Sequence, residues 1–473
     1  MSAHDLLAIA PITVVALFAL IAMMVDALGK RSTGAMQITA IVGLLGGIGA
    51  AIWTLPESVS GFGGLVAGGG TTALFDMLFC SAALLTVLLA RDFFARLADL
   101  YDEFYTLLLM ATAGAMLMAH ATDFITLFVG LELMSVSFYV MAGFMRRDLR
   151  SNEAALKYFL LGAFASGFLL YGMALIYGAV GGTGYADVIA GAAGSEWPTL
   201  LWAGIGLMTV GLAFKVAAFP FHQWAPDVYE GAPTVVTGFM STAGKAAAFS
   251  AFIIFLQALV GSGVEGIERL ATVLAVLAVG SMFIGNLTAI AQTSVKRMLA
   301  YSSVAHAGYM LIGLASLSSE GFFGVLYYLI AYLFMQIGAF AIVGMLEREE
   351  GKNLSFADYR GLGKRRPAVA MIMAIFMFSL TGIPPFAGFF GKYQIFRSAI
   401  DADMTWLAIC GVVASVISVW FYLGLVVSMF FRESEDVAPA STGLAAMPKV
   451  ALAVAVIGTL VIGFLPGVIY GAM

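Results

Sequence analysis

The chain has 473 residues, of which 62% are hydrophobic and 11% are charged, and its formal net charge is −5. This composition excludes a soluble globular domain, and no basic block points to nucleic acid. The apolar runs are too long for the alternating strands of an outer-membrane barrel, so helices remain as the structure that satisfies the backbone in lipid. Cys80 and Cys410 lie in different apolar runs and give neither a disulfide framework nor a metal-ligand cluster. We therefore predict an all-α polytopic membrane protein.

Charged, polar and Gly/Pro-rich breaks divide the chain into about fourteen apolar segments, each near the roughly 20 residues that cross a bilayer. These segments are 6–28, 36–54, 72–90, 103–119, 123–144, 154–180, 200–223, 233–259, 268–291, 297–315, 321–346, 367–400, 404–430 and 449–469. The first segment lacks the basic leader of a cleavable signal and is expected to stay as an anchor. We expect one transmembrane domain over 1–473. Its parts are N-terminal helices 1–3 in 1–100, repeat one in 103–259, repeat two in 268–430 and helix 14 in 449–469.

Lysine and arginine positions predict the orientation of the chain. Alternate breaks hold 17 of the 23 basic residues: Lys30, Arg31, Arg91, Arg96, Arg146, Arg147, Arg150, Lys296, Arg297, Arg348, Lys352, Arg360, Lys364, Arg365, Arg366, Arg432 and Lys449. The opposite breaks hold only Arg269. Because basic loops stay in the cytoplasm, both termini are expected on the periplasmic side.

Two of the expected helices are broken, and both breaks lie near a lysine. The seventh segment breaks at Phe219-Pro220, just after Lys215, and the twelfth breaks at Pro384-Pro385, before Lys392. Proline and glycine are common in membrane helices, but two such breaks in matching places favour a repeat. The breaks are five segments apart. Because successive spans cross the membrane in alternating directions, two helices that are five spans apart run in opposite directions. Helices 4–8 and 9–13 are therefore expected to form inverted repeats, which are typical of transporters.

Five titratable residues fall inside the apolar segments: Glu132, Lys215, Lys245, His306 and Lys392. At ~1.5 Å rise per residue, they lie about 12–18 Å from the nearer membrane face where depth can be counted, near the middle of the bilayer. A lysine there costs about 2.5–3.5 kcal/mol, so function is the default interpretation. Burial favours a neutral lysine and a nearby carboxylate favours the charged form, so such a lysine can take up and release a proton. We expect Glu132 to be the counter-ion of Lys215. His306 can bridge the two halves, or it can be an ordinary core histidine.

Three more ionisable positions have two interpretations each. His222, beside the first break, could gate a cytoplasmic half-channel or only cap a helix. Glu153 and Lys157 could form an ordinary i,i+4 pair or mark where protons enter. Four acidic residues near segment ends have structural interpretations, at a helix N-terminus or at the membrane surface: Asp227, Glu230, Asp26 and Asp76.

Three stretches resemble a known family. They read FHQWAPDVYEGAPT over 221–234, YSSVAHAGY over 301–309 and GIPPFAGFFGK over 382–392. They are similar to motifs of the antiporter-like subunits of respiratory complex I, and most similar to the subunit N family. The resemblance implies a fourteen-helix antiporter fold and a proton-translocating role within an NADH:quinone oxidoreductase. The family's key groups map onto Glu132, Lys215, Lys245 and Lys392, with Glu153, Lys157 and His222 as further ionisable positions.

The resemblance also implies where the redox chemistry takes place. No cofactor is expected in this chain, while NADH, FMN, iron–sulfur clusters and quinone belong to partner subunits. The expected partners are sister antiporter-like subunits, small membrane subunits and lipid, in a bacterial cytoplasmic membrane. Two alternatives stay open: a subunit of a multi-subunit Na⁺/H⁺ antiporter with the same fold, or a scaffold whose buried charges only hold helices together. The wording of 221–234 argues against the antiporter.

Overall fold

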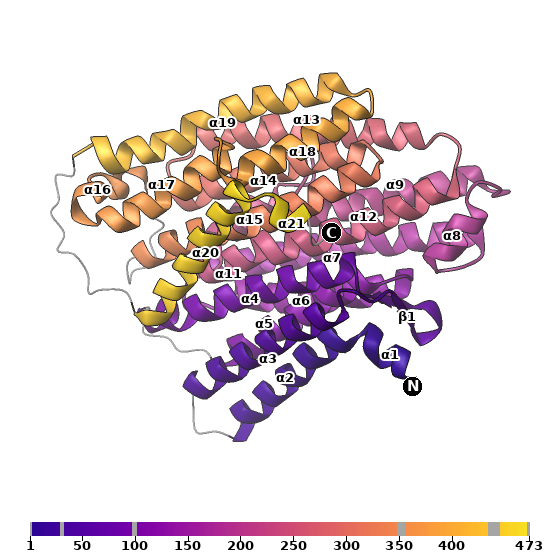
Figure 1. The fold of residues 1–473 in the computed structure, drawn as a ribbon, viewed down its shortest axis with the longest axis horizontal. Coiled ribbons are helices and arrows are strands. Elements are labelled where there is room, and N and C mark those ends of the chain that lie inside the picture. Colours follow the sequence, from indigo (N-terminus) through magenta and orange to yellow (C-terminus); the bar gives the residue numbers. More distant parts are fainter. Residues whose placement is uncertain (1, 29–32, 97–101, 348–354, 434–444, 471–473) are drawn as a thin grey trace.

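The computed structural model describes residues 2–28, 33–96, 102–347, 355–433 and 445–470. Most of its helices run along the long axis of the molecule (Figure 1). Twelve helices of the described part are long and apolar enough to cross a membrane, which confirms an all-α polytopic membrane protein. Four basic residues that entered the orientation argument lie outside the described residues: Lys30, Arg31, Arg348 and Lys352.

The N-terminal elements are α1 (Ala3–Ala8), α2 (Ala10–Leu28), α3 (Thr33–Thr54), β1 (Val59–Gly61), β2 (Val66–Gly68) and α4 (Thr71–Arg96). The middle elements are α5 (Glu103–His120), α6 (Phe124–Ala142), α7 (Leu149–Val180), α8 (Tyr185–Gly191), α9 (Pro198–Lys215), α10 (Trp224–Gly231), α11 (Thr234–Phe239), the π-helical turn η2 (Met240–Gly244) and α12 (Lys245–Ser262). The C-terminal elements are α13 (Ile267–Ile290), α14 (Val295–Ala315), α15 (Ser319–Leu346), α16 (Leu362–Arg365), α17 (Pro367–Thr381), α18 (Ala387–Asp401), α19 (Thr405–Phe431), α20 (Ala446–Phe464) and α21 (Gly467–Tyr470).

The chain leaves helical geometry at both expected breaks. Helix α9 ends at Lys215, and Pro220 lies in the turn before α10, where it has no N–H to continue a helix. Helix α17 ends at Thr381, and Gly382 adopts a left-handed conformation with φ of 87°. The Gly382 N–H donates to the Phe378 and Ser379 carbonyls, as expected of a glycine that ends a helix. Each break therefore places helix ends inside the bundle, where side chains can bond their last backbone groups.

Three acidic residues differ from their expected settings. Asp227 and Glu230, expected in the loop just before segment 233–259, both lie in the short helix α10. Asp76, expected at the membrane surface, is fully buried in α4. Its Oδ2 lies 2.8 Å from Nε2 of His120, which the sequence analysis had not singled out. The surface prediction for Asp76 was wrong because a partner 44 residues away makes burial possible.

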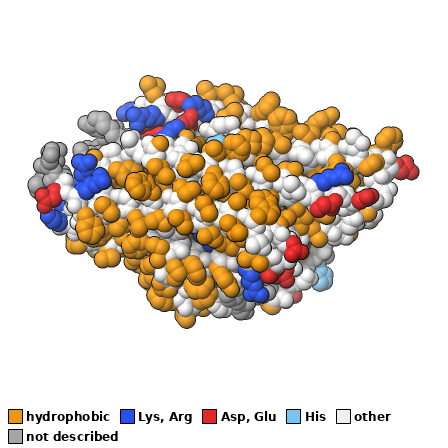
Figure 2. All heavy atoms as spheres, turned by 90° about the horizontal axis from the view of Figure 1, so that it is seen from above, with side chains coloured by type: hydrophobic (Ala, Val, Ile, Leu, Met, Phe, Trp, Pro, Cys, Tyr) orange, Lys and Arg blue, Asp and Glu red, His pale blue; other side chains and the backbone are white. Residues whose placement is uncertain are grey.

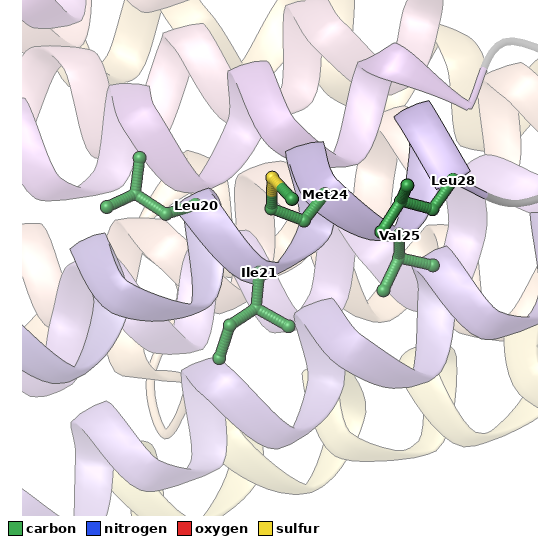
Figure 3. Close-up of a pocket in the computed structure, with 5 residues that line it drawn as sticks. All are labelled: Leu20, Ile21, Met24, Val25 and Leu28. Carbon is green, nitrogen blue, oxygen red and sulfur yellow. The ribbon is translucent and has the colours of Figure 1, made fainter.

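The interior of the bundle is formed mainly by α14, α15 and the helix that runs through α11 and α12. In the most apolar stretch of α14, 94% is buried inside the protein. The corresponding share is 22% in α2 and 33% in α19. Figure 2 shows hydrophobic side chains over most of one face, with charged side chains gathered mainly toward its ends. A hollow on α2 is lined by Leu20, Ile21, Met24, Val25 and Leu28 (Figure 3). It contains no ionisable side chain, so the chemistry has to be sought inside the bundle.

Candidate functional site

Lys215 is buried at the C-terminal end of α9. Its Nζ donates to Ser135 Oγ at 2.9 Å and to the Tyr139 hydroxyl at 3.4 Å, both on α6. Glu132 lies on α6 one turn before Ser135. The Oε1 of Glu132 makes no hydrogen bond with a described residue. Hydroxyl groups of α6 therefore supply the hydrogen bonds of the lysine, and the expected pairing of Glu132 with Lys215 stays a prediction.

Lys245 is the first residue of α12, directly after the π-helical turn η2. Its side chain is 2% exposed. The Nζ atom donates to the Ser303 carbonyl at 2.5 Å and to Ser303 Oγ at 2.6 Å, both on α14. π-Helical turns occur frequently at functional sites because they displace the side chains around them. The turn aims Lys245 at the second half of the chain.

Lys392 lies one turn into α18, after the second break. Its Nζ donates to the Thr381 carbonyl at 2.9 Å and to the Leu380 carbonyl at 3.4 Å. These are among the last carbonyls of α17, and a helix C-terminus carries a partial negative charge that favours a cation. The Nζ atom also lies 4.4 Å from the ring centroid of Tyr309. The broken helix thus supplies the polar partners of its own lysine.

A cavity of about 480 Å³ reaches Lys392 from the side of the bundle. Its walls include Gly382 and Pro384 of the break, Tyr393 of α18 and Ser415 of α19. Thr381, whose carbonyl holds the lysine, also lines it. The second break therefore leaves open space next to a buried amine.

His306 is held by two tyrosines. Its Nδ1 lies 2.6 Å from the Tyr328 hydroxyl of α15, and its Nε2 lies 2.9 Å from the Tyr422 hydroxyl of α19. The Tyr422 hydroxyl also lies 2.5 Å from Ser302 Oγ. His306 therefore has a hydroxyl partner at each ring nitrogen.

Helix α14 connects these groups. Ser303, His306 and Tyr309 follow one another at a spacing of three residues, so they lie on one side of the helix. Ser303 contacts Lys245, and Tyr309 lies under Lys392. The structure therefore brings Lys245, His306 and Lys392 together around one buried helix.

A second polar cluster joins α7, α10 and α14. Lys157 Nζ lies 2.7 Å from Glu153 Oε1 and 2.8 Å from Asp227 Oδ2. Arg297 Nη1 lies 2.8 Å from both Asp227 Oδ1 and Glu230 Oε2. A cavity of about 340 Å³ borders all five residues. The expected i,i+4 pair is thus part of a larger cluster that ties the first half of the chain to the second.

Burial alone would raise the pKa of Asp227, but hydrogen bonds from Lys157 and Arg297 hold that pKa below its usual value. Asp227→Asn is therefore expected to lower the stability of the folded subunit, by about 1 kcal/mol because the pairs are partly exposed. The stabilisation is complete above the ordinary carboxyl pKa of about 4 and is lost only as the pH falls through the lower folded value. Heat-dissociation curves of the purified assembly should therefore show the same deficit from about pH 6 to 8.

The matched control is Glu153→Gln, which removes one contact of Lys157 from a carboxylate that is 63% exposed. We expect it to change the dissociation temperature very little. If Asp227→Asn behaves like Glu153→Gln, Asp227 does not hold the cluster together.

His222 lies in the turn before α10, with its ring 5.8 Å from that of Phe219. Its Nδ1 makes no hydrogen bond with a described residue. No hydrogen bond of Nδ1 therefore supports the helix-capping interpretation.

Residues 121–418 match the profile of a protein family described as "NADH:quinone oxidoreductase/Mrp antiporter, TM". The chain belongs to this family. It is 44% identical over 465 residues to NADH-quinone oxidoreductase subunit N 1 of Chloroherpeton thalassium, with 96% of each chain covered. It is also 44% identical to NADH-quinone oxidoreductase subunit N of Trichlorobacter lovleyi, covering 93% of this chain and 90% of that one.

Solved structures of the family share the fold. A chain of respiratory complex I from Thermus thermophilus with bound Aureothin superposes with a TM-score of 0.84, at 34% identity and 98% coverage of both chains. A chain of the Mrp complex from Dietzia sp. DQ12-45-1b gives a TM-score of 0.86 at 23% identity, covering 100% of this chain and 96% of that one. The second likeness shows a common fold alone.

Sequence reasoning within this family missed several polar residues of the two clusters. Tyr328 and Tyr422 bind His306, and Ser303 binds Lys245. Arg297 was counted only as a cytoplasmic charge, although it bonds two carboxylates. Serine and tyrosine are common in membrane helices, so their presence in the sequence did not mark these residues as partners of Lys245 and His306. The positive-inside pattern explained Arg297 without a partner.

Proposed function

We propose that the chain moves protons across a bacterial inner membrane as a subunit of NADH:quinone oxidoreductase. The observation that carries this proposal is the row of Lys215, Lys245, His306 and Lys392, each buried and each held by hydroxyl or carbonyl groups. A buried amine that has only neutral hydrogen-bond partners can lose its proton without leaving a charged partner behind. Such a row suits stepwise proton transfer.

The geometry suggests an order for the groups. Protons would enter beside Glu153, Lys157 and His222 on the cytoplasmic side. They would pass Lys215, whose charge state responds to Glu132, and then Lys245. From Lys245 they would move along the side of α14 that carries Ser303 and His306, and reach Lys392. The cavity beside Lys392 would give that amine contact with its surroundings. Moving each proton against the membrane potential requires ~2.3 kcal/mol per 100 mV, which redox chemistry in partner subunits would supply.

The finer architecture fits the same role. The twelve long apolar helices would make up the fourteen expected spans if α5 and the broken pair α17–α18 each cross the membrane as well. Residues 103–259 and 268–430 would form the inverted repeats, with both termini in the periplasm. The relatives named NADH-quinone oxidoreductase subunit N support placement in the same complex, among sister membrane subunits. NADH, FMN, iron–sulfur clusters and quinone would then be bound by partners, and none by this chain.

The test of the proposal is Lys215→Ala in the assembled complex. We expect NADH oxidation with an artificial acceptor to continue while NADH-driven proton pumping into membrane vesicles falls by about tenfold, because a relay group is lost. Lys449→Ala, at an exposed lysine of α20, is the control and should pump normally. An unchanged number of protons per NADH in Lys215→Ala would remove the proposed role of this residue. Purification of a complex that exchanges Na⁺ for H⁺ without NADH oxidation would favour the antiporter alternative.

A further inference from the structure

The hydroxyl of Tyr422 lies between two partners that belong to the same helix. It is 2.5 Å from Ser302 Oγ and 2.9 Å from His306 Nε2. Ser302 and His306 are one helical turn apart on α14, while Tyr422 comes from α19, about 120 residues away in the chain. Tyr422 is 1% exposed, so its hydroxyl is oriented inside the protein. The Tyr422 hydroxyl therefore joins two polar groups of α14 inside the protein.

The other ring nitrogen of His306 continues the series. Its Nδ1 lies 2.6 Å from the Tyr328 hydroxyl. The Tyr328 ring lies directly against Gly391, the residue before Lys392, where an added Cβ would meet Cδ2 at 2.0 Å. At the opposite end, Ser302 precedes Ser303, which holds Lys245. A series of four hydrogen-bonding groups, Ser302, Tyr422, His306 and Tyr328, therefore begins at the residue before Ser303 and ends at the ring that packs against Gly391.

We propose that Tyr422 and Ser302 form, with His306 and Tyr328, a hydroxyl–imidazole relay that links Lys245 to Lys392. This inference rests on the proposed function, and it names residues that the row of ionisable groups does not contain. Hydroxyl groups both donate and accept, so each can receive a proton on one side and release one on the other. Linked hydrogen bonds of this kind also strengthen one another in a low-dielectric interior.

The transfer is balanced at every atom. Ser302 gives its hydroxyl proton to Tyr422 as it receives one from the Lys245 side. Tyr422 gives its own proton to His306 Nε2, and His306 releases the proton of Nδ1 to Tyr328. Tyr328 passes its hydroxyl proton toward Lys392. One proton enters, one leaves, and each O–H or N–H bond that breaks is replaced by a new one. His306 ends as the other neutral tautomer.

The test is Tyr422→Phe in the assembled complex, with Tyr327→Phe as a matched control. Tyr327 is also fully buried, and its hydroxyl donates to the Ile462 carbonyl at 3.0 Å, away from the relay. Both variants keep the ring and lose one hydroxyl. We expect NADH-driven proton pumping to fall by about tenfold in Tyr422→Phe only, the loss expected for a strong hydrogen bond in the transfer step.

The pH profile of pumping should also change in Tyr422→Phe and not in Tyr327→Phe, because His306 loses the partner of Nε2. The ionisable groups around His306 are Lys245, Lys392, Tyr309, Tyr328, Tyr332 and Tyr422. If Tyr422→Phe fails to assemble, Ser302→Ala breaks the same series with a smaller change and should slow pumping. Normal pumping with an unchanged pH profile in Tyr422→Phe or in an assembled Ser302→Ala would overturn the relay. Lys215→Ala separates the two proposals: if it stops pumping while Tyr422→Phe does not, only the relay fails.

Discussion

Lys392→Gln is expected to reduce NADH-driven proton pumping by about tenfold or more while the subunit still assembles. A missing acid–base group commonly costs a factor of about 10² to 10⁴ in the step that it serves. Glutamine can still donate a hydrogen bond to the Thr381 carbonyl, which Lys392 now holds at 2.9 Å. The end of α17 therefore keeps a partner, and only the titratable proton is removed. The measurement is the rate of acidification of membrane vesicles that contain the complex.

Two companion variants separate charge from structure at this position. Lys392→Met removes both the proton and the donor, so it leaves buried carbonyls unpaired at about 1–3 kcal/mol each and should lower stability as well. Lys364→Gln makes the same substitution at an exposed lysine, paired with Glu433 at 2.8 Å, and should leave pumping unchanged. If Lys392→Gln pumps as well as Lys364→Gln, Lys392 serves only to hold the broken helix. That outcome would favour the scaffold interpretation of the buried charges.

The fold could largely be predicted because unpaired backbone groups and buried charges are costly in lipid. A backbone in lipid has to be helical, and the breaks at Pro220 and Pro384 follow from the missing N–H of proline. The lysines stood out for the same reason, because a buried charge is costly enough to need an explanation. What the sequence could not give was the identity of their partners. Lys392 is held by backbone carbonyls, and every residue has a carbonyl, so the residue types cannot show which carbonyls bind it.

Contacts between distant segments explain the rest of the difference. Lys215 was expected to pair with Glu132, but the hydroxyls of Ser135 and Tyr139 are its hydrogen-bond partners. The common face of Ser303, His306 and Tyr309 could have been found from their spacing of three residues. The contribution of Tyr422 could not, because α19 follows α14 by some 90 residues and its polar residues look ordinary. Tertiary packing decides which hydroxyls meet the midplane groups.

The buried pair of Asp76 and His120 leads to the second large effect. His120 Nδ1 lies 3.0 Å from the Ala8 carbonyl, which can only accept, so Nδ1 carries a proton. Asp76 Oδ2 lies 2.8 Å from Nε2, and that contact also needs a proton. Whether this proton is on the carboxyl or on the ring, the pair is neutral overall. The arrangement fixes α1 to α4 and α5 without a net buried charge.

Asp76→Ala is therefore expected to destabilise the subunit by about 3–5 kcal/mol, since it leaves Nε2 of His120 buried without a partner. Asp76→Asn should cost far less, because its amide can donate to Nε2 while Nδ1 still donates to the Ala8 carbonyl. Heat-induced loss of the subunit from the purified complex measures both effects. Hydrogen exchange in residues 3–8 should rise in Asp76→Ala, because α1 loses its anchor. Equal stability of the alanine and asparagine variants would show that the hydrogen bond to Nε2 contributes nothing, and that packing alone holds α1 in place.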